Sequence, residues 1–109
     1  MVPLSRREEQ VLMAVWRLKS NAYLVSIKKH LTALTGTKWP LSAVQKPLLQ
    51  LEKKKFIETS TGEATATRGG RRKKMCRITN LGVDALKALK QEQDVLWKEF
   101  LHEEWEPGN

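Results

Sequence analysis

The sequence has little of the chemistry that most enzymes and metal proteins need. Cys76 is the only cysteine among 109 residues, so neither an intrachain disulfide nor a zinc-finger or CxxC spacing can occur. The two histidines, His30 and His102, lie far apart in the chain, and the only aspartates are Asp84 and Asp94. No nucleophile, metal or acid-base set assembles from these residues, so we expect no enzyme activity, no metal and no cofactor.

A long hydrophobic run is also missing. The longest apolar run covers residues 11–16, whereas a helix that spans a bilayer needs roughly 20 residues. Charged residues at Arg6 and Glu8 come before any apolar stretch of signal-peptide length. We therefore expect a cytoplasmic protein without a membrane partner, and 109 residues suit one compact domain.

Positive charge is plentiful but unevenly distributed. Lysine and arginine total 20 against 12 acidic residues. Up to Thr79 there are 17 positive and 5 negative residues, a net charge of +12, whereas the remainder has 3 and 7, a net charge of −4. A basic block beside an acidic tail favours a polyanionic partner, most often nucleic acid and less often an anionic membrane surface, over a plain solvated surface.

Two short helices are predicted near the start of the chain. Ser5 and Glu8 have the spacing of a capping box, and a helical repeat of apolar residues follows over residues 6–19. A second repeat covers Leu24–Thr35 and stops at Gly36, a natural residue for a left-handed helix end. The apolar positions of both helices are expected in the core: Val11, Leu12, Val15, Trp16, Leu18, Leu24, Ile27, Leu31 and Leu34.

A third helix opens near Pro40 and has two distinct faces. The apolar face is formed by Leu41, Val44, Leu48 and Leu51. The polar face is formed by Ser42, Gln45, Lys46 and Lys53. Pro47 lies inside this repeat, where a proline removes a backbone hydrogen bond and costs on the order of 3 kcal/mol. The helix therefore either kinks at Pro47 or starts later.

A hairpin and a long helix complete the predicted fold. Residues 56–60 and 72–78 are predicted to pair as two strands, and their long tip contains the tight pair Gly69-Gly70. Thr79 can cap a last helix that begins near Asn80. Five positions with heptad spacing form its predicted dimerisation seam: Leu86, Leu89, Gln93, Leu96 and Phe100. A helix that reaches His102 spans roughly 34 Å, so its distal half is expected to meet another chain.

This order of elements is that of a winged helix-turn-helix, a mainly α fold with a two-stranded β wing (α+β). We expect residues 1–79 to form a DNA-binding domain and residues 80–109 to form a dimerisation helix with a frayed tail. The third helix would lie in the major groove, where Ser42, Gln45 and Lys46 can reach base edges. Gln45 is the best candidate for a base contact. Whether Leu49 or Gln50 also reaches the DNA depends on how Pro47 bends the helix.

The wing is the expected phosphate-binding element. Its arginines can hold phosphates or enter a narrow minor groove, and its two glycines let the backbone approach the DNA closely. The predicted DNA-binding residues of the wing are Arg68, Gly69, Gly70, Arg71, Arg72, Lys73 and Lys74.

The wing also carries a family resemblance. Residues 62–65 (Gly-Glu-Ala-Thr), 68–73 (Arg-Gly-Gly-Arg-Arg-Lys) and 77–82 (Arg-Ile-Thr-Asn-Leu-Gly) resemble the wing of PadR-type transcriptional regulators. Residues 21–23 (Asn-Ala-Tyr), the turn at residues 51–53 and the opening helix are similar to the same family, so the resemblance covers about residues 4–102. Four departures from the family's pattern occur, at Leu24, at Pro47, at Lys55 and at the pair Met75-Cys76.

The resemblance implies a dimeric repressor whose C-terminal helix pairs the subunits. Binding to a palindromic operator would be relieved by a small, often aromatic, molecule or by another signal. The resemblance also implies that Tyr23 contacts a DNA phosphate, and that Trp97 either stacks on a flat effector or packs in the dimer. Lys55 would carry a strain of about 1 kcal/mol if its backbone is left-handed.

An alternative function uses the same basic hairpin. The protein would then be a winged-helix module that binds nucleic acid without sequence preference or that serves in protein interaction. A ratio of specific to non-specific affinity near one would favour this alternative. Cys76 is expected to be a small buried hydrophobe, because a redox sensor would need a resolving cysteine.

Overall fold

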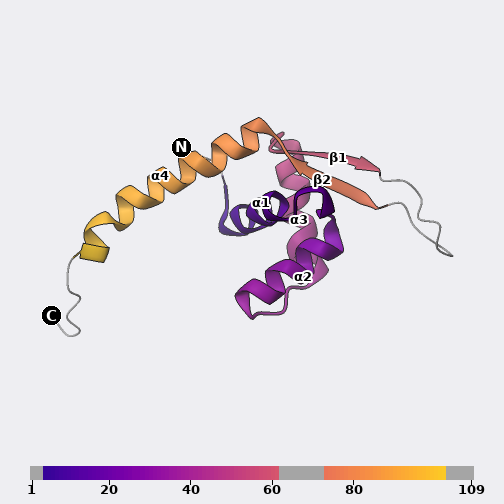
Figure 1. Ribbon diagram of the computed structural model, residues 1–109, viewed down its shortest axis with the longest axis horizontal. Coiled ribbons are helices and arrows are strands. Elements are labelled where there is room, and N and C mark those ends of the chain that lie inside the picture. Colours follow the sequence, from indigo (N-terminus) through magenta and orange to yellow (C-terminus); the bar gives the residue numbers. More distant parts are fainter. Residues whose placement is uncertain (1–3, 62–72, 103–109) are drawn as a thin grey trace.

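The computed structural model describes residues 4–61 and 73–102, with the backbone alone for residues 101 and 102. The elements follow the predicted order of three helices, a hairpin and a long helix (Figure 1). They are α1 (Arg6–Leu18), a 3₁₀ turn η1 (Lys19–Asn21), α2 (Leu24–Thr35), α3 (Leu41–Lys53), β1 (Ile57–Thr61), β2 (Lys74–Ile78) and α4 (Asn80–His102). The predicted mainly α fold with a two-stranded β hairpin is confirmed.

Local capping explains where the helices begin and end. The Ser5 hydroxyl accepts a hydrogen bond from the Glu8 amide at 3.1 Å, and the Ser5 amide donates to Glu8 Oε1 at 2.9 Å, which confirms the capping box. Gly36 ends α2 in the left-handed conformation with φ 70°, as predicted. The Thr79 hydroxyl accepts from the Gly82 amide at 3.1 Å and so caps α4.

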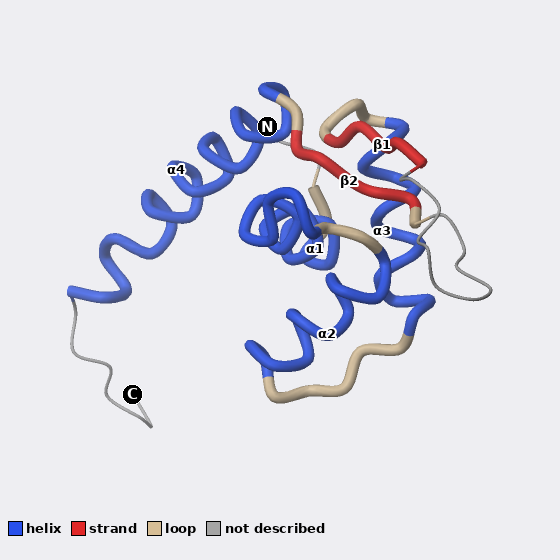
Figure 2. Tube along the Cα trace, turned by 45° about the vertical axis from the view of Figure 1, so that its right-hand side comes forward, coloured by secondary structure: helices blue, strands red, loops and turns tan. Residues whose placement is uncertain are grey.

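The core lies between α1, α2, α3 and the hairpin (Figure 2). Its fully buried large side chains are Val11, Leu12, Val15, Ile27, Val44, Leu51 and Ile57. Three residues that the helical repeats place in the core are instead exposed: Trp16 by 43%, Leu34 by 57% and Leu41 by 45%. Leu34 lies in the last turn of α2 and Leu41 in the first turn of α3. Lys19 Nζ lies 3.8 Å from the centre of the Trp16 ring and covers it in place of a core neighbour.

Helix α3 is continuous through Pro47, so the prediction that it starts later is wrong. The Pro47 ring is buried on the side of α3 that faces α1, away from the polar face. Its apolar contact area offsets part of the cost of the missing backbone hydrogen bond. After α3, Lys55 takes the left-handed conformation with φ 65°, the backbone for which a strain of about 1 kcal/mol is expected.

Strands β1 and β2 pair antiparallel, from Ile57 opposite Ile78 to Thr61 opposite Lys74. Cys76 is buried as expected, and this burial raises the pKa of its thiol. The hairpin and α4 extend from the body in opposite directions, which gives the molecule dimensions of 62 × 29 × 20 Å (Figure 1). Among the described helices, none has the length and apolar character of a membrane span.

Candidate nucleic-acid interface

The outer face of α3 is polar and open. Ser42, Gln45 and Lys46 are all exposed, as the predicted DNA-reading face requires. Leu49, which is 47% exposed, and Gln50 are exposed as well, Leu49 toward the hairpin and Gln50 toward α1. Short polar side chains on an uncovered helix can approach base edges in a major groove.

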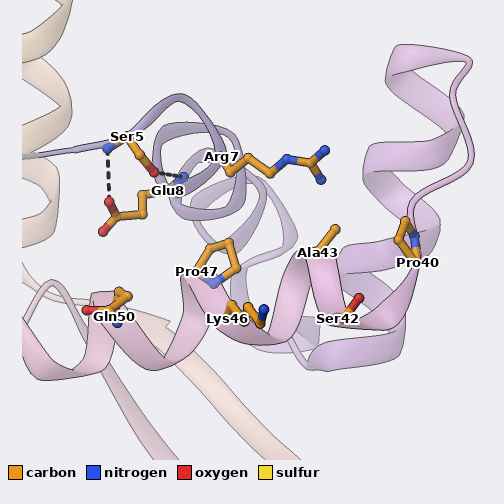
Figure 3. Close-up of a pocket in the computed structure, with 9 residues that line it drawn as sticks. All are labelled: Ser5, Arg7, Glu8, Pro40, Ser42, Ala43, Lys46, Pro47 and Gln50. Atoms are coloured by element: carbon orange, nitrogen blue, oxygen red, sulfur yellow. Dashed lines mark hydrogen bonds between the residues drawn. The ribbon is translucent and has the colours of Figure 1, made fainter.

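One edge of this face borders the start of α1. A groove of about 400 Å³ separates the two helices, and Figure 3 shows the side chains that surround it. Its lining consists of Ser5, Arg7, Glu8, Pro40, Ser42, Ala43, Lys46, Pro47 and Gln50. The groove therefore combines residues of the predicted reading face with side chains of α1 that the sequence patterns did not mark for binding.

The opposite edge of α3 borders the hairpin. A smaller cavity of about 140 Å³ lies there, with Gln45 and Leu49 on the α3 side and Thr59 and Lys74 on the hairpin side. Glu52 joins these elements, since its carboxylate accepts a hydrogen bond from the Thr59 hydroxyl and lies 3.5 Å from Lys74 Nζ. The Thr59 hydrogen bond and the charge of Lys74 lower the pKa of Glu52.

Tyr23 and Lys73, two predicted phosphate-binding residues, meet at the end of the hairpin where β2 begins. The Nζ atom of Lys73 lies 4.3 Å from the centre of the Tyr23 ring. Tyr23 is held at the start of α2, where its amide donates to the Ser26 hydroxyl at 2.9 Å. The Cys76 amide donates to the Ala22 carbonyl oxygen at 2.8 Å and ties β2 to the same place. The fold thus gathers a phenol, an ammonium group and a helix start at one edge of α3.

The remaining wing residues are only partly accounted for. Lys74 is exposed but pairs with Glu52, and Arg77 pairs with Glu58 at 3.6 Å. Arg68, Gly69, Gly70, Arg71 and Arg72 lie outside the described residues.

The five residues of the predicted dimerisation seam fall into two groups. Leu86, Leu89 and Gln93 are half-buried, and the Gln93 amide donates to Glu9 of α1 at 3.3 Å. Leu96 and Phe100 are 73% and 59% exposed. The first group packs on the body of its own chain, whereas the second is left uncovered.

Trp97 lies with the uncovered group. It is 52% exposed, and its ring packs edge-on against Phe100 with the ring centres 5.2 Å apart. Effector stacking and dimer packing both stay predictions for this ring.

Two features of the interface escaped the sequence patterns. The guanidinium of Arg7 stacks on the ring of Trp39, with its Cζ atom 4.9 Å from the ring centre. Lys54 Nζ lies 2.6 Å from the carboxylate of Glu8, which is only 7% exposed. Burial alone would raise the pKa of Glu8, but hydrogen bonds from Lys54 and Ser5 outweigh it and hold the pKa below its ordinary value of 4.5.

Within residues 4–61 and 73–102, histidine, cysteine and carboxylate side chains form no cluster that could hold a metal ion. The residues that surround the outer face of α3 offer hydrogen-bonding groups and the positive charges of Arg7, Lys46 and Lys73. These groups suit recognition of a polar, anionic partner.

Comparisons with known proteins give a consistent fold. No family model and no curated protein matches the sequence. A transcriptional regulator from Clostridium thermocellum is similar in structure, with a TM-score of 0.71 and 20% identity over 88% of this chain and 87% of that chain. A PadR-like transcriptional regulator from Bacillus cereus has a TM-score of 0.68 and 21% identity over 87% of both chains. A PadR family transcription regulator from Clostridium difficile has a TM-score of 0.67 and 23% identity over 89% of this chain and 99% of that chain. The chain has the winged-helix fold of PadR-like transcriptional regulators.

Proposed function

We propose that this protein is a DNA-binding transcriptional regulator of the PadR type. It represses transcription by binding a palindromic operator as a homodimer in the cytoplasm, and a signal that changes the dimer releases it. The observation that carries the proposal is the open polar face of α3 beside the contact between Tyr23 and Lys73. The regulators of the same fold support it. No step of this function needs a cofactor or catalysis.

In the proposed complex, α3 lies in the major groove and Gln45 donates to or accepts from a base edge. Ser42 and Lys46 flank it. Tyr23 and Lys73 hold the phosphate backbone beside the hairpin, and the arginines at residues 68–72 extend this contact along the DNA. Phosphate contacts fix the position of the protein, whereas Gln45 supplies sequence preference.

The homodimer is supported by the uncovered residues of α4, which include Leu96 and Phe100. Two copies joined there would present two reading helices to half-sites about 34 to 36 Å apart. The signal acts on this joint, where Trp97 offers an aromatic ring to a small aromatic effector. A change in the separation of the reading helices would then change the affinity for DNA.

The deciding experiment is equilibrium binding of the full chain to DNA upstream of its own gene, with unrelated duplex as competitor, at two salt concentrations. A preference of about a thousandfold or more supports an operator-reading regulator. Equal affinity for both duplexes favours the alternative of a non-specific nucleic-acid-binding module. Absence of binding to either duplex rejects the DNA-binding proposal and leaves protein interaction.

A matched pair of variants separates the two kinds of contact. Gln45→Ala should reduce the preference for the specific duplex by about 1 to 3 kcal/mol and leave non-specific binding unchanged. Tyr23→Phe removes one hydroxyl but keeps the ring that Lys73 contacts. It should weaken binding to both duplexes by the same factor, because a phosphate contact carries no sequence information.

A further inference from the structure

Arg6 and Arg7 are neighbours in the first turn of α1, but their side chains have different partners. Arg6 pairs with Glu9 at 3.6 Å. Arg7 stacks on Trp39, and among the described residues no carboxylate lies within 4.0 Å of its guanidinium. Figure 3 shows the Arg7 side chain reaching from α1 over the first half of α3, away from Glu8. One of the two positive charges is therefore satisfied within the protein, and the other is available to a partner.

The stacking platform of Arg7 is itself fixed. Trp39 is only 6% exposed, and its indole N–H donates to the Thr35 hydroxyl at 3.1 Å. Its backbone amide donates to the Thr32 hydroxyl at 3.3 Å. A guanidinium held flat on such a ring loses little additional freedom when it binds an anion.

The charge in the groove between α1 and α3 is positive in spite of Glu8. The Glu8 carboxylate is neutralised by Lys54 at 2.6 Å and also accepts a hydrogen bond from the Ser5 amide. Lys46, on the opposite wall of the groove, forms no ion pair with any described residue. Arg7 and Lys46 are thus two unpaired cations on facing walls, and Ser5 and Ser42 line the same groove.

The groove lies on the edge of α3 opposite the hairpin. Positions 42, 46 and 50 line it, whereas positions 45 and 49 line the cavity beside the hairpin. A helix in the major groove has one phosphate backbone along each of its sides. Tyr23 and Lys73 serve only the side next to the hairpin.

We infer that the groove between α1 and α3 binds the second phosphate backbone of DNA, with Arg7 and Lys46 as its phosphate-binding side chains. This inference rests on the proposed function and adds a second point of attachment to it. The reading helix is then held from both edges, which fixes its rotation in the groove. Lys46 acts here on phosphate and not on a base edge.

The test compares Arg7→Met with Arg6→Met, two variants that remove the same charge from adjacent positions. Methionine can still pack on Trp39, and thermal unfolding checks that both variants fold. Binding to a fluorescein-labelled random-sequence duplex is measured over a series of salt concentrations. Arg7→Met should weaken binding about tenfold at low salt. Affinity should also fall less steeply with salt, because the slope of log affinity against log salt loses about 0.9 of its magnitude with one phosphate contact. Arg6→Met should keep the parental slope, and Arg7→Lys should restore it.

The outcomes separate the groove from the function as a whole. A parental slope in Arg7→Met, or an equal loss in Arg6→Met, overturns the inference while the DNA-binding proposal stands. A parent protein that binds no duplex at any salt concentration overturns both. A less steep salt dependence in Lys46→Met, and a still less steep one in the double variant with Arg7→Met, supports the two-residue site.

Discussion

The first half of α4 packs on the body of the protein, whereas the second half extends away from it (Figure 1). Ala85 belongs to the core and Leu86 packs against it. Leu96 and Phe100 continue the same heptad spacing, yet more than half of each side chain is exposed. A heptad repeat therefore marks an apolar face, but it does not say whether the chain itself or a second chain covers that face.

The largest expected effect concerns the uncovered half of α4. Leu96→Asp combined with Phe100→Asp places charges where the proposed dimer buries apolar surface. The dissociation constant of the dimer should rise about a thousandfold or more, since burying an unpaired charge is costly. Sedimentation equilibrium over a range of protein concentrations measures it.

The same double variant should leave the fold of the single chain unchanged within about 0.5 kcal/mol, because exposed side chains contribute little to it. Val25→Asp is a suitable control, since Val25 is 40% exposed on α2 and far from α4 in sequence. Dimers that persist at micromolar concentration in the double variant would contradict the assignment of this surface.

In the packed half of α4, a substitution should destabilise the fold of the single chain. A Cβ atom at Gly82 would overlap the carbonyl oxygen of Phe56 and lie 2.8 Å from Cγ1 of Ile78. Because the first contact is with backbone, Gly82→Ala should destabilise the fold by about 3 kcal/mol, which urea unfolding measures. At Gly36 a Cβ meets open space, so Gly36→Ala should cost only about 1 kcal/mol from its left-handed backbone. Equal costs for the two substitutions would show that α4 is not seated on Phe56.

The stability of the body on which the first half of α4 packs should also depend on pH. Glu8 joins α1 to Lys54 at the end of α3, and its pKa lies below the ordinary value of 4.5. Its stabilising effect is therefore complete above pH 4.5 and is lost as the pH falls through the lowered pKa. Glu8→Gln should cost about 2 kcal/mol at neutral pH, and this difference should close in acid. If the difference in unfolding free energy between the parent and Glu8→Gln stays constant down to pH 3, the loss comes from the changed shape of the side chain and not from its charge.

Much of this architecture could be predicted because it depends on local spacing. The capping box at Ser5, the turn at Gly36 and the cap at Thr79 each involve residues within a few positions of one another. The polar face of α3 also follows from spacing alone. Pro47 left two alternatives, a kink or a later start, because the sequence does not indicate that its ring is buried inside a helix that runs through residues 41–53.

The contacts between distant positions could not be predicted. Glu8 and Lys54 are separated by 46 positions, and nothing in either neighbourhood indicates the pair. The same holds for Arg7 on Trp39, and for Trp16, whose helical position suggests the core although the residue is 43% exposed. These features depend on how the helices pack, and periodicity does not carry that information.

The smallest expected effect tests where the packed half of α4 ends. Lys90 and Asp94 form an ion pair one turn apart, close to Gln93, whose amide donates to Glu9. Both side chains are more than half exposed, and the lysine precedes the acid, which is the less favourable order on a helix. Asp94→Asn should therefore change the free energy of unfolding by no more than about 0.5 kcal/mol, and added salt should remove the difference. A cost above 1 kcal/mol that persists in high salt would mean that α4 is held against the body beyond Gln93, and the division of the helix would have to move toward its C-terminal end.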